Sequence, residues 1–86
     1  MMFEFDIAKS AINKEKHGID FIEAQMLWED PDLIEIPAKI VGESRFLVIG
    51  LILGKHWSGI ITYRREKIRI ISICRSRPEE VDIHEN

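Results

Sequence analysis

The chain has 86 residues, of which 45% are hydrophobic and 31% are charged, and its formal net charge is −3. This length allows one small domain over residues 1–86, and this composition excludes a disordered chain as the default. The longest hydrophobic run, 46–53, is far shorter than the roughly 20 residues of a membrane-spanning helix. The N-terminus resembles no signal peptide, and the lone Cys74 excludes an internal disulfide. We therefore expect a soluble, cytoplasmic protein that does not act at a membrane.

Two helices are predicted in the first half, after a short strand at 3–5. Asp6 is a favourable N-cap for a helix over 7–17, which Gly18 ends. The expected apolar stripe of this helix consists of Ile7, Ala8, Ala11 and Ile12. Another face carries Lys9, Asn13 and Lys16. A second helix begins at Asp20, with Glu23 completing a capping box, and ends before Pro31. The expected apolar positions of this second helix are Phe21, Ala24, Leu27 and Trp28.

The second half predicts strands joined by short connections, which favour antiparallel pairing. The expected strands are 33–36, closed by Pro37, and then 45–53, 57–64 and 68–74. On the last strand, alternation places Ile70, Ser72 and Cys74 on one face and Arg75 on the other. A short helix over 79–85 follows. The predicted class is therefore α+β, with two N-terminal helices packed on an antiparallel sheet of about four strands, and a short C-terminal helix.

Positive charge is concentrated in the segment 55–77, which holds seven basic residues and one acidic residue, a net charge of +6. The remainder carries −9. Such a segment suits a polyanion or an acidic protein partner, and it is also compatible with a solvated sheet face. Arginine guanidinium groups in particular bind phosphate with two parallel hydrogen bonds.

The histidines have no metal-ligand spacing among themselves or with Cys74, so we expect neither a metal site nor a cofactor. Cys74 lies late in an apolar strand, where inert packing is the favoured interpretation. His17 ends a helix beside Lys16, and two interpretations remain open. It complements the negative end of the helix, or it exchanges protons in catalysis.

Several short motifs, in order along nearly the whole chain, resemble the BrnT family of type II toxins. The opening resembles the family in Phe5-Asp6, Lys9, Asn13 and Lys16-His17-Gly18-Ile19. The second predicted helix does so in Phe21, Glu23-Ala24, Trp28 and Asp30. The strands do so in Glu43, Arg45 and Gly50, in Tyr63-Arg64, and in the string Arg69-Ile70-Ile71-Ser72. Two positions depart from the family pattern. Cys74 stands where an arginine is usual, and His84 stands where a tyrosine is common.

This resemblance implies a RelE-like fold and a metal-independent endoribonuclease that uses the 2′-hydroxyl of RNA as its nucleophile. It also implies a cognate BrnA-type antitoxin as partner. Two assemblies remain open, a homo-oligomer of the chain or a hetero-oligomer of toxin and antitoxin. The expected catalytic residues are His17, Arg45, Arg64, Arg75 and Glu43. The expected RNA-binding residues are Lys16, Tyr63, Arg65 and Arg77. The departures at Cys74 and His84 favour an alternative, a degenerate module that binds RNA or antitoxin without cleaving.

Overall fold

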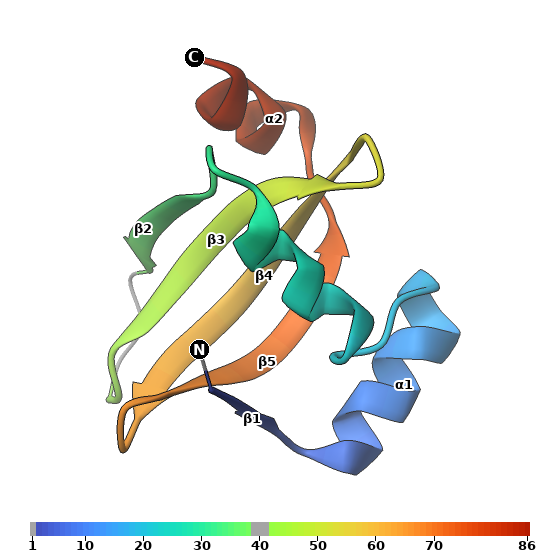
Figure 1. Cartoon of the computed structure of the whole chain (residues 1–86), viewed down its shortest axis with the longest axis vertical. Coiled ribbons are helices and arrows are strands. Elements are labelled where there is room, and N and C mark those ends of the chain that lie inside the picture. The colour runs from blue at the N-terminus through green and yellow to red at the C-terminus, as the bar shows by residue number, and fades with distance from the viewer. Residues whose placement is uncertain (1, 39–41) are drawn as a thin grey trace.

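The computed structural model describes residues 2–38 and 42–86. The chain folds around a five-stranded mixed sheet (Figure 1). The elements are β1 (Phe3–Phe5), α1 (Ile7–His17), the 3-10 helix η1 (Glu23–Glu29), β2 (Ile34–Ala38), β3 (Arg45–Ile52), β4 (Lys55–Arg64), β5 (Lys67–Arg75) and α2 (Pro78–Glu85). The strand order is β1-β5-β4-β3-β2. No helix in the described ranges is long and apolar enough to cross a membrane.

The α+β class is confirmed, but the expected sheet of about four antiparallel strands is wrong in one respect. The segment 3–5 joins the sheet as a fifth strand, and β1 runs parallel to β5. Most of the chain separates these two strands, so no tight turn forces them to be antiparallel. β2 also continues through Pro37, which was expected to close it. Proline is tolerated there because β2 is an edge strand.

α1 has the predicted bounds but not the predicted buried face. The Asp6 carboxylate accepts a hydrogen bond from the Lys9 N–H at 3.0 Å, and Gly18 ends the helix with a φ of 81°. The expected apolar stripe is wrong, since Ile7 is 81% exposed and Ile12 is 54% exposed. The buried side chains of α1 are instead those of Ser10 and Asn13.

Polar contacts explain this reversal, because α1 lies beside the end of β5 (Figure 1). β1 pairs with β5 only as far as Ile70, so the N–H of Ile73 has no strand partner on that side. The Asn13 side chain accepts a hydrogen bond from this N–H at 3.2 Å and donates one to the Ile19 carbonyl at 2.8 Å. The Ser10 hydroxyl accepts a hydrogen bond from the Phe21 N–H at 2.9 Å. These bonds fix α1 against the sheet.

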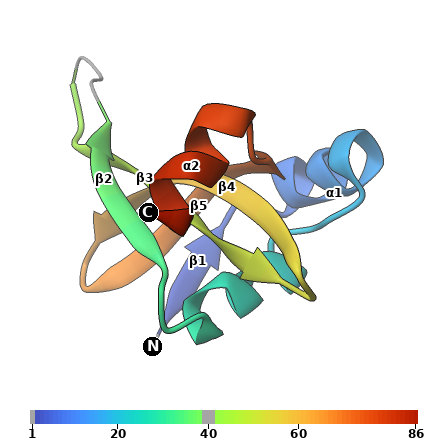
Figure 2. The same ribbon diagram turned by 90° about the horizontal axis from the view of Figure 1, so that it is seen from above.

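η1 begins with the predicted capping box, in which Asp20 and Glu23 each accept hydrogen bonds from the other's N–H. The segment is a 3-10 helix rather than an α-helix, and it begins at Glu23 rather than at Asp20. Phe21, Ala24 and Leu27 are buried in the core as predicted. η1 covers one face of the sheet and α2 lies against the opposite face (Figure 2).

A β-bulge in β5 changes the expected faces of this strand. Ile60 pairs with Ser72 but Ile61 pairs with Ile70, so Ile71 is an extra residue. Ile68, Ile70 and Ile73 therefore all face the core, each at 5% exposure or less. The prediction that Ile70 shares a face with Ser72 and Cys74 is wrong, because alternation assumes a regular strand.

Candidate functional site

A groove of about 240 Å³ lies between α1 and β5, and it gathers basic side chains from the first and the last turns of the helix. Lys9, Asn13 and Lys16 line this groove together, which confirms that they share one helix face. His17 joins them from the last turn, and Ser72 lines the β5 side. The groove thus combines an imidazole with two primary amines, beside the hydroxyl of Ser72.

This combination suits a phosphodiester. The amines attract the negatively charged backbone, and histidine is the side chain that most often transfers protons in catalysis. Lys14, in the same last turn, points elsewhere. Its Nζ lies 2.8 Å from Glu23 Oε1, and this hydrogen bond raises the pKa of Lys14 and lowers that of Glu23. Only part of the basic surface of α1 therefore faces the groove.

A second set of the predicted residues lies near the β4–β5 turn, namely Glu43, Arg45, Tyr63, Arg64 and Arg65. Two of these arginines face carboxylates. Arg45 Nη2 lies 3.3 Å from Glu43 Oε2, and Arg64 Nη1 lies 3.9 Å from Glu4 Oε2. Arg65 lies in the tight turn itself, with a φ of 50°. This end of the sheet therefore carries cations with acidic neighbours.

Tyr63 belongs to this end and is already engaged with an acidic residue. Its hydroxyl donates a hydrogen bond to Glu35 of β2, and its ring packs edge-on against Phe46. Partial burial, together with the bond and the charge of Glu35, raises the pKa of Tyr63 to about 12. A phenol with this pKa is a weaker proton donor than an ordinary tyrosine.

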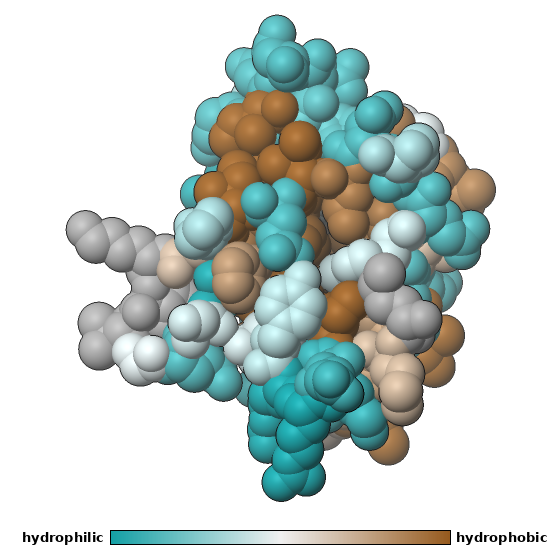
Figure 3. Space-filling model, turned by 60° about the vertical axis from the view of Figure 1, so that its left-hand side comes forward, coloured by the Kyte–Doolittle hydropathy of each residue, from teal (hydrophilic) through white to brown (hydrophobic). Residues whose placement is uncertain are grey.

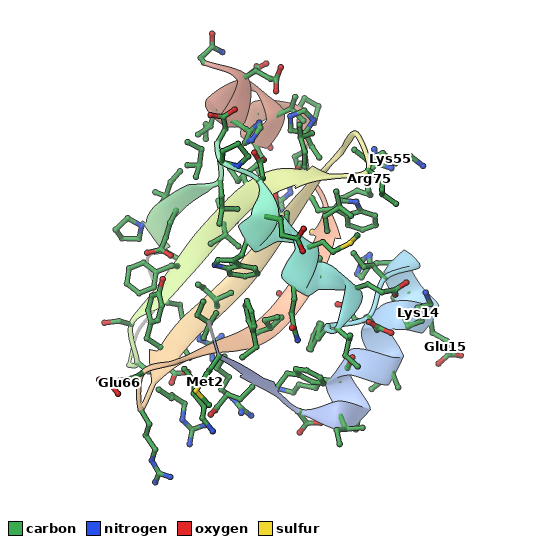
Figure 4. The ribbon with its side chains drawn as sticks, in the orientation of Figure 1. Met2, Lys14, Glu15, Lys55, Glu66 and Arg75 are labelled. Atoms are coloured by element: carbon green, nitrogen blue, oxygen red, sulfur yellow. The ribbon has the colours of Figure 1, made fainter. Side chains whose placement is uncertain are left out.

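Arg75 and Arg77 lie at the opposite end of the sheet from Arg64. Figure 4 shows Arg75 beside Lys55, far from Glu66 in the β4–β5 turn. Arg75 pairs with Trp57, and Arg64 lies seven positions further along β4 than Trp57, a span of about 23 Å at about 3.3 Å per residue. The structure thus does not bring these arginines together around one phosphate.

The two arginines at this end also differ in their surroundings. The Arg75 guanidinium lies 5.4 Å from the centre of the Trp57 ring, on the core face of the sheet. Arg77 caps α2 and lies near Cys74, which follows Ser72 along the outer face of β5.

Cys74 is half-buried between β5 and α2. Burial raises the pKa of its thiol, the charge of Glu80 raises it further, and the charge of Arg77 opposes both. A raised pKa keeps the sulfur protonated and unreactive near neutrality. This supports the interpretation of Cys74 as a packing residue.

A third cluster brings together His56, His84, Glu85 and Asp30, which form no recognisable motif in the sequence. His84 Nδ1 lies 3.2 Å from His56 Nε2 and 3.2 Å from Glu85 Oε2, and the last two atoms lie 2.9 Å apart. On its other side, His84 Nε2 lies 2.9 Å from Asp30 Oδ2. His56 and His84 are 28 positions apart, so no local motif could have predicted their contact.

Burial and charge act in opposite directions in this cluster. Burial alone disfavours the charged forms of Asp30 and His84, whose side chains are 6% and 3% exposed. The hydrogen bonds to the Asp30 carboxylate nevertheless lower its pKa, and the Asp30 and Glu85 carboxylates raise the pKa of His84. The contacts of Asp30 and His84 thus outweigh the effect of burial and favour the charged form of each group.

The sequence profile of one family, described as the ribonuclease toxin BrnT of type II toxin–antitoxin systems, matches residues 5–80. The match includes the α1–β5 groove and every predicted site residue, and it ends within α2, before His84 and Glu85. A comparison of the chain with curated proteins found no match.

Proposed function

Because the chain belongs to the BrnT family of ribonuclease toxins, we propose that it is an endoribonuclease that binds its RNA in the α1–β5 groove. The observation that carries this proposal is the convergence of His17, Lys16 and Lys9 on one groove beside Ser72. We further propose that residues 1–86 form one toxin domain with a RelE-like fold.

In the proposed reaction, the RNA supplies its own nucleophile. A base removes the proton of the 2′-hydroxyl, whose oxygen attacks the adjacent phosphorus. The bond from phosphorus to the 5′-oxygen breaks, and an acid protonates the leaving oxygen. The products are a 2′,3′-cyclic phosphate and a free 5′-hydroxyl. We assign His17 one of the two proton transfers, and we propose that the chemistry requires no metal ion.

Lys9 and Lys16 stabilise the negative charge that develops on the phosphate oxygens. Arg77, at the N-cap of α2 beyond the end of β5, binds a phosphate further along the RNA. Glu43, Arg45, Tyr63, Arg64 and Arg65 lie at the far end of the sheet, so in this scheme they contact flanking RNA rather than the reacting bond. Arg75 packs on Trp57, and we assign it no contact with the reacting phosphate.

Cleavage of a defined RNA in the presence of a chelator tests this scheme. His17→Ala should reduce the rate by about 10²- to 10⁴-fold, the usual contribution of an acid or base. Its melting temperature should stay near that of the wild type, because His17 is exposed. Wild-type cleavage by a folded His17→Ala protein would refute the assignment. A 2′-deoxy substitution at the cleaved nucleotide should abolish the reaction.

Lys16 and Lys14 provide a matched pair for RNA binding, since only Lys16 lines the groove. Lys16→Ala should reduce the slope of log affinity against log salt by about 0.7, the value for one phosphate contact on a single strand. Lys14→Ala should leave this slope nearly unchanged. Equal losses from the two substitutions would show that the groove does not hold the RNA.

The alternative is a module of the same family that binds RNA or antitoxin without cleaving. The departures at Cys74 and His84 favour it, because Cys74 lacks a guanidinium and His84 faces Asp30 rather than the groove. RNA retardation in a gel without cleavage, under conditions where the protein is folded, would support this alternative.

Two exposed apolar surfaces favour a protein partner, which we propose to be the cognate antitoxin. The first is the stripe on α1 that includes Ile7 and Ile12. The second lies between α2 and β2, where Figure 3 shows hydrophobic surface and where Ile34 and Ile36 are only half-buried. Apolar patches on small proteins commonly mark interaction sites. Co-purification with the antitoxin, and its loss in an Ile7→Asp, Ile12→Asp variant, would test the first surface.

A further inference from the structure

The cluster of His56, His84 and Glu85 has the composition and geometry of a metal site. We propose that these three side chains bind one divalent transition-metal ion of the zinc class, at a site separate from the RNA groove. The proposal goes beyond ribonuclease function and shares no residue with the α1–β5 groove.

The distances among the three donor atoms support this proposal. They are 2.9, 3.2 and 3.2 Å, which is close to an equilateral triangle. A tetrahedral zinc ion with bonds of about 2.0–2.1 Å has neighbouring ligand atoms about 3.4 Å apart. The three atoms therefore lie within a few tenths of an ångström of one face of such a tetrahedron, and water can occupy the fourth position.

Asp30 orients the buried ligand. Its Oδ2 accepts hydrogen bonds from the Leu51 N–H and from the Nε2 side of His84, each at 2.9 Å. Metal binding displaces the proton of Nδ1, while the proton held on Nε2 toward Asp30 keeps the Nδ1 lone pair directed at His56 and Glu85. A carboxylate behind a histidine ligand is the usual support in zinc sites. The side chain of His84 is only 3% exposed, so its orientation is fixed by packing.

The ligand types determine the class of ion. Two imidazoles and one carboxylate suit Zn²⁺, Co²⁺, Ni²⁺ or Cu²⁺, whereas Mg²⁺ and Ca²⁺ prefer oxygen ligands throughout. The bound ion would connect the last turn of α2 to β4, and through Asp30 to the end of η1. Apart from the His84 side chain, α2 is only partly buried against the sheet, so such a link would add to the few contacts that hold this helix.

The test uses the full-length protein after removal of metal by a chelator. Titration with Zn²⁺, and with Co²⁺ as a visible-absorbing probe, should show saturable binding of one ion per chain. Zinc at about 100 times its dissociation constant should raise the melting temperature by roughly 10 °C or more, as expected for ligand binding to a domain of this size.

Three substitutions test the ligand set. Glu85→Gln removes the charge of a 56% exposed side chain and should fold normally, while its zinc affinity falls at least tenfold. His56→Ala should also bind zinc at least tenfold more weakly. Asp30→Asn should weaken binding by about 10- to 100-fold, the usual effect of a lost supporting carboxylate.

His17→Ala and Cys74→Ser are the matched controls, and both should bind zinc with wild-type affinity. Absence of saturable binding by a folded wild-type protein would overturn the proposal. So would unchanged affinity in Glu85→Gln and His56→Ala, or loss of binding in either control. A folded, metal-free Glu85→Gln protein that cleaves RNA at the wild-type rate would show that the metal site and the ribonuclease site are independent.

Discussion

Asn13 and Ile12 are neighbours on α1. A hydrophobic pattern predicts that Ile12 is buried and Asn13 is exposed, whereas the structure buries Asn13 and exposes Ile12. Replacing Asn13 by alanine leaves two backbone groups without their partners, the N–H of Ile73 and the carbonyl of Ile19. Each buried group that loses its hydrogen bond costs about 1–3 kcal/mol. Water can reach the edge of the sheet, so we expect the lower part of the sum, about 2–4 kcal/mol.

This loss is large for the chain, because domains of this size are stable by only about 4–13 kcal/mol. The melting temperature of Asn13→Ala should fall by roughly 8–32 °C, at about 4–8 °C per kcal/mol. Ile12 is 54% exposed, so Ile12→Ala should change stability by no more than about 0.5 kcal/mol. Asn13→Asp keeps an acceptor for Ile73 but buries a carboxylate oxygen against the Ile19 carbonyl, so it should lose at least as much stability as Asn13→Ala.

Urea unfolding followed by circular dichroism measures all three variants against the wild type. The reasoning is refuted if Ile12→Ala is destabilised as much as Asn13→Ala, because α1 would then pack through its apolar stripe. Asn13 also lines the RNA groove, so cleavage by Asn13→Ala should be compared below its melting transition.

Three further outcomes are expected. Tyr63 is the single tyrosine, so phenolate absorbance should report its titration with a midpoint near pH 12, and Glu35→Gln should lower this midpoint. The hydrogen bond from Tyr63 to Glu35 should stabilise the fold below pH 10, and this stabilisation should be lost as the pH rises through the raised pKa of folded Tyr63. A midpoint near pH 10 in folded protein would contradict this prediction. Leu53 is 89% exposed, has a φ of 50° and precedes a glycine in the two-residue turn between β3 and β4. Asparagine adopts a positive φ more easily than leucine, so Leu53→Asn should stabilise the protein by about 0.5–1 kcal/mol, measured in a thermal melt. A methyl group on Gly59 would lie 2.5 Å from Ile73 Cδ1, so Gly59→Ala should cost about 1–3 kcal/mol; an unchanged urea midpoint would show that the core has room there.

Features that depend on a few neighbouring residues could be predicted from the sequence. The Asp6 cap, the Gly18 stop and the box of Asp20 and Glu23 each involve residues within one or two helical turns, and all three are present. The family assignment rests on similarly short motifs. The shared face of Lys9 and Lys16 follows from helix periodicity alone, because it needs no knowledge of what the helix packs against.

Only the tertiary structure decided which side of α1 is buried and where the charged residues meet. The partner of Asn13 is an N–H left free because β1 ends early, and no pattern within α1 contains that fact. The bulge at Ile71 likewise depends on pairing with β4, and it reverses the face of every residue beyond it. His56 and His84 meet because α2 returns to the sheet at the point where β4 begins. Contacts between residues this distant are set by packing of whole elements, so local sequence carries no signal for them.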